Sequence, residues 1–223
     1  MRKVLIGTPA HDGRVDVWYC NSLVNTIKLA AQQNIQIDPV YLSYDSLIQR
    51  ARNDLVRLAL EEGYDDLIFI DSDQEWNPAW IFELLNHDVD VIGGTVVKKN
   101  DQETLFNVKA LPEGLIMAYG KIEVACVGTG FMRISRKALQ TVWDMSAEYK
   151  NEGRVCRMVF DVIVKDGELI SEDNVFCNKW RSTGGQVFID PTMTCNHIGT
   201  KKYSGNFMHF YHWLQNQQLL KVA

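Results

Sequence analysis

The stretch that decides the fold reads Leu67-Ile68-Phe69-Ile70-Asp71-Ser72-Asp73, an apolar run that ends in two carboxylates. Four consecutive apolar residues, two of them β-branched, predict a strand that is buried on both faces. Side chains two positions apart leave a strand on the same side, so Asp71 and Asp73 can converge on one point. Two such anions need a neutralising partner, and their oxygens suit Mg²⁺ or Mn²⁺. The alternative is a turn in which both aspartates cap the helix that opens near Asn77.

Strands and helices alternate through the first half of the chain. Apolar spacing predicts further strands at residues 4–7, 35–42 and 89–97, and helices at residues 18–33, 46–62 and 77–85. Residues 8–14 are polar, contain glycine and proline, and are expected to form a loop. This order predicts an α/β fold with a mainly parallel, doubly wound sheet flanked by helices.

The second half of the chain is less regular. We expect an antiparallel hairpin between residues 104–109 and 115–124, and a glycine turn at 127–130 that leads into a strand. Residues 154–170 are expected to supply more strand, with a hairpin turn at Asp166-Gly167. A helix should follow from 171 to 184, then a strand at 186–190 and a helix at 206–220. At 223 residues without an obvious linker, the chain is expected to form a single domain.

Net charge and cysteine content indicate which partners and which cellular compartment to expect. The formal charge of −5 gives no general attraction to nucleic acid or to anionic membranes, although a local basic patch stays possible. The five cysteines are an odd number without a C-x-x-C pair, which favours reduced thiols over a disulfide framework or a zinc site. Neither a signal peptide nor a long apolar run is apparent. We therefore expect a cytoplasmic protein that does not insert into a membrane.

Several motifs occur in an order that is typical of one family. They are Thr8-Pro9, Ser46-Leu47-Ile48-Gln49-Arg50-Ala51-Arg52-Asn53, Phe69-Ile70-Asp71-Ser72-Asp73, Val127-Gly128-Thr129-Gly130-Phe131-Met132, Ser171-Glu172-Asp173, Lys179-Trp180-Arg181, Gly184-Gly185 and His197-Ile198-Gly199. Together they resemble nucleotide-sugar-dependent glycosyltransferases of the GT-A fold, close to compact forms encoded by large viruses and phages. One signature departs: Cys177-Asn178-Lys179-Trp180 stands where inverting members carry Q-x-x-R-W. The stereochemical outcome is therefore left open, with inversion favoured.

The resemblance implies a nucleotide-binding half over residues 1 to about 100 and an acceptor side over 101–223. It also implies a metal site in which Asp73 ligates the ion and Asp71 contacts the ribose or reaches the metal through water. His197 would be the third protein ligand, and its imidazole favours Mn²⁺ over Mg²⁺. Taken alone, a histidine in this position is more often a hydrogen-bonded structural residue.

The same resemblance implies residues that bind the nucleotide and its diphosphate. These are Thr8, Pro9, Arg52, Ser72, Gly130, Lys201 and Lys202, beside the two aspartates. A fixed guanidinium at Arg52 suits phosphate or base edges. The alternatives are an exposed helix arginine at Arg52 and solvated loop lysines at Lys201 and Lys202.

For the acid–base step the resemblance points to the pair Glu172 and Asp173, with Asp173 as the base that takes the acceptor proton. The alternative is helix capping, since Ser171 suits an N-cap and acids in the first turn suit the helix dipole.

The sequence thus predicts a transferase that moves a sugar from a nucleoside-diphosphate donor, with UDP-sugar favoured, to a glycan or another hydroxyl acceptor. Three alternatives remain. A nucleotidyltransferase would carry a Gly-rich basic loop after the first strand, and residues 7–12 are not one. A carbohydrate-binding protein would use tryptophans as stacking surfaces but has no need of converging acids. A glycosyltransferase that acts on nucleobases in viral DNA is disfavoured by the acidic balance, so nucleic acid stays a less favoured acceptor.

Overall fold

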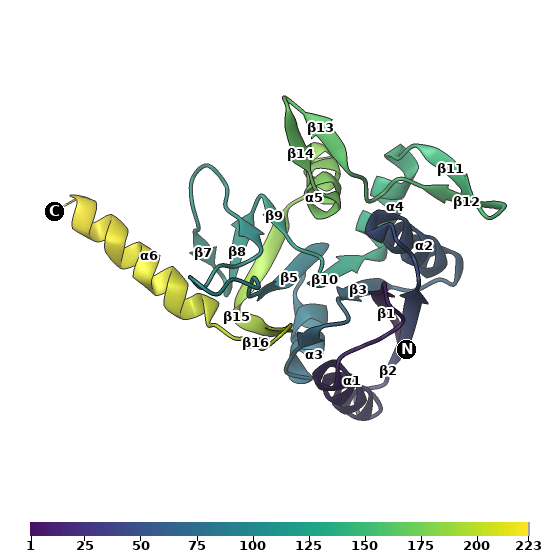
Figure 1. The fold of residues 1–223 in the computed structure, drawn as a ribbon, viewed down its shortest axis with the longest axis horizontal. Coiled ribbons are helices and arrows are strands. Elements are labelled where there is room, and N and C mark those ends of the chain that lie inside the picture. The colour runs from purple at the N-terminus through teal and green to yellow at the C-terminus, as the bar shows by residue number, and fades with distance from the viewer. Residues whose placement is uncertain (223) are drawn as a thin grey trace.

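The protein is built on a mixed central sheet with the strand order β2-β1-β3-β10-β5-β15-β8-β7 (Figure 1). The computed structural model describes the chain through residue 222. The strands that pair in parallel are β1 (Arg2–Ala10) with β2 (Ile35–Ser43) and β3 (Asp66–Ile70), and β5 (Val91–Val96) with β15 (Val187–Ile198). Strand β10 (Phe131–Ser135) lies between β3 and β5 and is antiparallel to both. The parallel order expected of the first half is therefore interrupted by a strand from the second half.

Helices cover both faces of this sheet, so the fold has three layers (Figure 1). The helices are α1 (Val17–Ala30), α2 (Ile48–Glu61), α3 (Ala79–Asn86), α4 (Arg136–Met145), α5 (Glu172–Ser182) and α6 (Phe207–Val222). Helices α1 and α3 pack on one face around Tyr19 and Ile81, whereas α2, α4 and α5 pack on the other around Leu55 and Phe176. All four of these side chains are fully buried. The two faces of β3 meet these two cores, which explains its uninterrupted apolar run.

Short strands complete the structure outside the parallel part. They are β4 (Gln74–Glu75), β6 (Val108–Lys109), β7 (Met117–Ala118), β8 (Lys121–Val124), β9 (Cys126–Val127), β11 (Glu148–Asn151), β12 (Arg154–Arg157), β13 (Ile163–Lys165), β14 (Glu168–Ile170) and β16 (Lys202–Tyr203). The hairpin expected at Asp166-Gly167 is present between β13 and β14, and both turn residues have positive φ.

The prediction of a hairpin between residues 104–109 and 115–124 is wrong. Strand β6 pairs with β9, and β8 pairs with β7 and β15 instead. The physical reason is burial, because Ile122 and Val124 of β8 are fully buried where β8 lies against β15.

Two local predictions also need correction. Residues 8–10 continue β1 as a strand, since Thr8, Pro9 and Ala10 stand in register with residues 41–43 of β2. Helix α4 was not expected from the sequence. It begins after Ser135, whose hydroxyl accepts a hydrogen bond from the backbone N–H of Ala138 as an N-cap.

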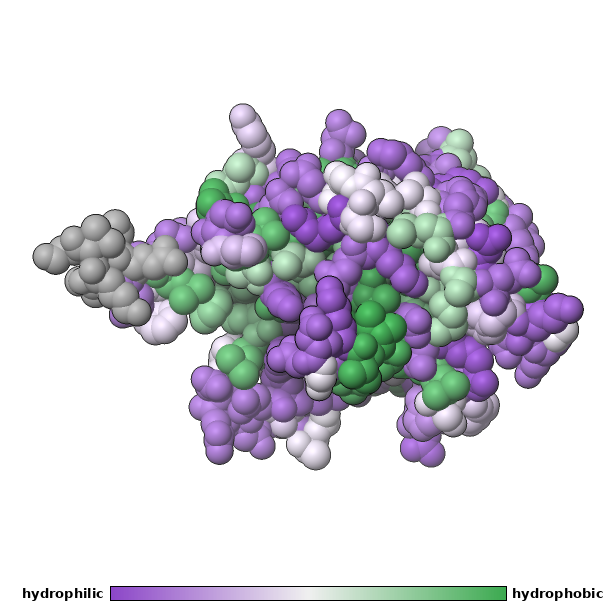
Figure 2. Space-filling view, turned by 90° about the horizontal axis from the view of Figure 1, so that it is seen from above, coloured by the Kyte–Doolittle hydropathy of each residue, from purple (hydrophilic) through white to green (hydrophobic). Residues whose placement is uncertain are grey.

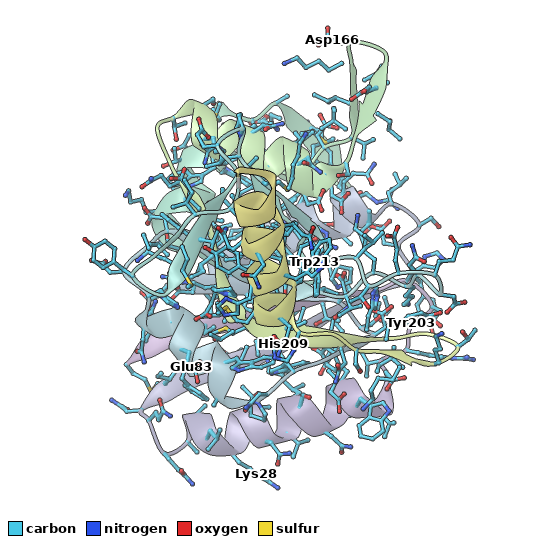
Figure 3. The ribbon with its side chains drawn as sticks, turned by 90° about the vertical axis from the view of Figure 1, so that its left-hand side faces the viewer. Lys28, Glu83, Asp166, Tyr203, His209 and Trp213 are labelled. Atoms are coloured by element: carbon cyan, nitrogen blue, oxygen red, sulfur yellow. The ribbon has the colours of Figure 1, made fainter. Side chains whose placement is uncertain are left out.

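The view from above shows a surface that is mostly hydrophilic, with hydrophobic residues in separate small groups (Figure 2). In the part of the chain that the structure describes, no helix combines the length and the apolar character needed to cross a membrane. The side view places Asp166 at the tip of the β13–β14 hairpin, and Lys28 on α1 at the opposite end of the molecule (Figure 3).

Candidate functional site

The end of β15 brings His197 to the aspartate turn that follows β3. The last part of β15 pairs with β4, so that His197 stands opposite Gln74. The backbone N–H of Ile198 donates to the carbonyl of Asp73 at 2.8 Å. As a result, Nε2 of His197 lies 3.2 Å from Oδ2 of Asp73, although the two residues are 124 positions apart.

The hydrogen bonds of His197 fix the chemistry of that approach. Its Nδ1 lies 2.9 Å from the carbonyl oxygen of Val97, and a carbonyl only accepts, so Nδ1 carries a proton. Nε2 can then face the Asp73 carboxylate only as a second N–H donor or with a cation between them. Burial alone would raise the pKa of Asp73, but hydrogen bonds from His197 and Lys99 outweigh it and lower the pKa to about 2. Asp73 is therefore held as a carboxylate that attracts cations.

A second charged group surrounds Arg52 on α2. Its Nη2 donates to Oδ1 of Asp71 at 3.0 Å, and its Nε donates to Oε1 of Glu172 at 3.3 Å. The Arg52 side chain is only 3% exposed, and its plane lies over the ring of Phe69 at 5.3 Å. Its Nη1 is buried without a hydrogen-bond partner in the described residues. A buried donor of this kind is costly unless a ligand oxygen accepts from it.

His197 and the group around Arg52 line one cavity of about 210 Å³ at the carboxyl end of β3, and Asp73 lies next to it through its contact with His197. Its lining includes Arg52, Asp71, Gly130, Glu172, Asp173 and His197. A side chain at position 130 would be crowded, because a Cβ there would lie 3.3 Å from both Oδ2 of Asp71 and Cγ2 of Val96. A larger cavity of about 510 Å³ adjoins it and shares Lys98, Asn107 and Asp173. The arrangement therefore offers two neighbouring cavities that both have Asp173 in their lining.

Asp173 also has a local structural role at the start of α5. Its Oδ1 accepts from the Ser171 hydroxyl and, at 2.7 Å, from the backbone N–H of Asn174. The Ser171 side chain makes no capping hydrogen bond of its own to the helix. Both the acid–base interpretation and the capping interpretation of Asp173 thus retain a structural basis, and the hydrogen bonds involve only one of its two oxygens.

The residues expected beside the nucleotide at the end of β1 lie deeper than the sequence suggested. The Thr8 side chain is fully buried, and its Oγ1 lies 2.6 Å from the hydroxyl of Tyr19. Burial raises the pKa of Tyr19, so this phenol stays neutral. Pro9 is buried as well. Ser72 is half-buried, and its carbonyl accepts from the N–H of Asp16 at 2.9 Å, which anchors the start of α1.

The two lysines expected to close over a diphosphate have other partners here. Nζ of Lys201 lies 2.6 Å from Asp101, and Nζ of Lys202 lies 2.7 Å from Glu75. Lys202 also lies over the ring of Trp18 at 3.5 Å. The lysine that reaches the aspartate turn is Lys99, whose Nζ lies 2.6 Å from Oδ2 of Asp73.

Lys99 was not predicted from the sequence, although a signal was present. The residue follows β5, and the carboxyl end of a strand in such a sheet is where ligand-binding side chains gather.

Asp73, His197 and Asp71 are the side chains that could bind a divalent cation. Asp73 and His197 direct Oδ2 and Nε2 at one another, and the Val97 carbonyl orients the imidazole as a metal ligand requires. Asp71 departs from the expected set, because its Oδ1 is bonded to Arg52. Through residue 222, no three side chains of His, Cys, Asp or Glu are grouped to hold a metal ion. The donors present thus fit two positions of a metal site, with Asp71 adjacent.

The chain matches no protein-family model and no curated protein. Among solved structures it is similar to A197 from STIV, with 19% identity, a TM-score of 0.56, and coverage of 89% of this chain and 86% of that one. A glycosyltransferase involved in the glycosylation of the major capsid of PBCV-1 overlaps 65% of this chain and 67% of its own, at 11% identity and a TM-score of 0.34. HddC from Yersinia pseudotuberculosis, complexed with GMP-PN, overlaps 82% and 97% at 11% identity and a TM-score of 0.35. Of these three likenesses, the one to A197 shows a shared α/β fold.

Proposed function

We propose that the protein is a metal-dependent glycosyltransferase of the GT-A type, which moves a sugar from a nucleoside-diphosphate donor to a hydroxyl of a glycan or another acceptor. The observation that supports this proposal is that His197, which contacts Asp73, and the Asp71–Arg52–Glu172 group line the same cavity. A binding protein has no need of such a costly arrangement of charge.

Residues beside the smaller cavity would bind the cation and the nucleotide. Asp73 and His197 would hold the cation, with Mn²⁺ favoured by the imidazole, and Asp71 would contact the ribose or reach the ion through water. When bound, the cation would neutralise the charge that develops on the departing diphosphate. The unpartnered Nη1 of Arg52 offers a hydrogen bond to an oxygen of the donor.

The transfer step itself would take place next to Asp173. The acceptor oxygen would form its bond to the anomeric carbon while the bond from that carbon to the diphosphate oxygen breaks. Asp173 would take the acceptor proton, because it lines both spaces. Glu172 would act through Arg52, whose position it fixes.

The donor and the metal are tested together by calorimetry of UDP with Mn²⁺ and with chelator. The parent protein should bind UDP much more tightly with Mn²⁺, whereas Asp73→Ala should show an affinity that no longer depends on the ion. Asp88→Ala is a suitable control, because Asp88 is an exposed acid on the loop between α3 and β5. Unchanged metal dependence in Asp73→Ala would contradict the assignment, and a screen of donors by release of the nucleoside diphosphate would then identify the substrate class.

A further inference from the structure

Two side chains from distant parts of the chain converge on a single oxygen of Asp73. Nζ of Lys99 lies 2.6 Å from Oδ2, and Nε2 of His197 lies 3.2 Å from the same atom. The position that the proposed function gives to a divalent cation therefore already has a cation beside it, and that cation belongs to the chain.

We propose that Lys99 is an exchangeable internal cation of this site. Its ammonium neutralises Asp73 in the metal-free protein and must leave when a divalent ion binds. Direct ligation places a metal roughly 2 Å from the carboxylate oxygen, and an ammonium cannot remain at hydrogen-bond distance from the same oxygen without strong repulsion. This inference rests on the proposed function, because it uses the same two ligands.

The position of Lys99 in the fold allows that exchange. The backbone of the preceding residue is anchored, since the N–H of Lys98 donates to the carbonyl of Leu105 at 2.8 Å. The side chain of Lys99, by contrast, is 38% exposed and extends across Gly199, where a Cβ would lie 3.2 Å from its Cδ. An ion pair that is this exposed contributes little to stability, so its rupture does not prevent metal binding.

Once displaced, the ammonium stays tethered beside the cavity, because the neighbouring Lys98 and His197 both line that space. A diphosphate bound there would be the nearest new anion for it. Lys99 would then stabilise the nucleotide in the absence of metal and weaken the binding of the metal alone. These two effects have opposite signs, and a purely structural residue would not produce both.

The test measures Mn²⁺ alone first, by electron paramagnetic resonance of the free ion. Lys99→Met removes the charge and keeps an unbranched side chain. It should bind Mn²⁺ roughly two- to tenfold more tightly than the parent, in line with the modest strength of an exposed ion pair. The same variant should bind UDP several-fold more weakly in chelator. Lys28→Met makes the same change of charge at an exposed position of α1 that does not line the cavity, and it should alter neither value (Figure 3).

A second pair of variants locates the effect at Asp73. In the Asp73→Asn background Mn²⁺ binding should be weak, and Lys99→Met should no longer strengthen it, because the shared oxygen no longer carries the charge. Equal or weaker Mn²⁺ binding by Lys99→Met in the parent background would overturn the proposal, as would the absence of Mn²⁺ binding in both proteins. A failure of the glycosyltransferase assignment would look different: no protein would bind UDP, while the gain in Mn²⁺ affinity on Lys99→Met would persist.

Discussion

Arg52 and Glu172 lie 120 residues apart in the sequence, and their side chains meet with Nε of Arg52 3.3 Å from Oε1 of Glu172. The same guanidinium reaches Asp71 through Nη2. One buried cation therefore ties the turn after β3 to the start of α5, which are the metal side and the acceptor side of the proposed site. The planar fork matters here, because its separate nitrogens reach the two carboxylates and present Nη1 in a third direction, whereas an ammonium is a compact point charge.

Arg52→Lys should consequently lower UDP affinity and turnover although it keeps the charge. Loss of at least one charge-assisted hydrogen bond, worth about 1.5–3 kcal/mol, predicts a loss in affinity of about tenfold or more. Calorimetry measures the UDP affinity, an assay of product release measures the turnover, and thermal unfolding shows whether the variant keeps its stability. The control is Arg50→Lys on the same helix, since Arg50 pairs with Asp45 away from the cavity. Equal behaviour of the two variants would show that Arg52 has no special role.

Asp173→Asn separates catalysis from capping. The asparagine keeps an oxygen that can accept from Ser171 and Asn174, so the helix start and the donor affinity should change little. Turnover should nevertheless fall by about 10²–10⁴, the usual contribution of a positioned base. Asp166→Asn, at the exposed tip of the β13–β14 hairpin, serves as the control (Figure 3). Turnover of Asp173→Asn within a few-fold of the parent would exclude the base and favour a mechanism with retention.

Gly130→Ala tests whether nucleotide binding depends on the close packing of Asp71 against residue 130. The added Cβ would stand 3.3 Å from Asp71 Oδ2 and from Val96 Cγ2, so one of them must shift by a few tenths of an ångström. We expect a several-fold loss of UDP affinity with a small change in melting temperature, because Gly130 needs no positive φ. An unchanged affinity would mean that the exact position of Asp71 does not matter for the nucleotide.

Asp90 offers a prediction about stability that is independent of the site. Burial raises the pKa of this acid, but hydrogen bonds from Lys137 and Ser135, each at 2.7 Å, outweigh it and leave the pKa below its ordinary value. The folded state thus holds the proton less tightly than the unfolded state, and the resulting stability is present above the unfolded pKa of about 3.9. It is lost as the pH falls through the lower folded value.

Asp90→Asn should therefore unfold more easily than the parent at neutral pH, by a few tenths to about 1 kcal/mol. The difference should shrink below about pH 4, where the parent also becomes protonated. Thermal unfolding over this pH range measures both points, with the exposed Asp88→Asn as control. A difference that stays constant down to the lowest pH would rule out the ion pair as its cause.

The parts of the fold that follow from local patterns were predictable. The apolar run before Asp71 forms a buried strand, and the helices α1, α2 and α3 lie within a few residues of their expected bounds, because helical and strand periodicity is set by near neighbours. The position of β10 and the pairing of β15 with β4 were not, since they join segments that no short-range pattern relates.

The same distinction applies to the site residues. Asp73 and His197 could be named from short motifs, whereas the partners of Lys201 and Lys202 exist only once Asp101 and Glu75 are placed by the tertiary fold. Lys99 was missed for the same reason, because its partner Asp73 is 26 residues earlier in the chain.

Because β10 lies between β3 and β5, the chain cannot be divided near residue 100 into two parts that fold separately. A fragment that ends near residue 100 would contain β3 and β5 without β10, which joins them, and without β15, so that one edge of β3 and both edges of β5 would be unpaired. Unpaired edges of apolar strands promote aggregation. Residues 1 to about 100 and the remainder of the chain therefore cannot be exchanged between related proteins at that boundary. A recombination that preserves the fold would have to carry β3, β10 and β5 together.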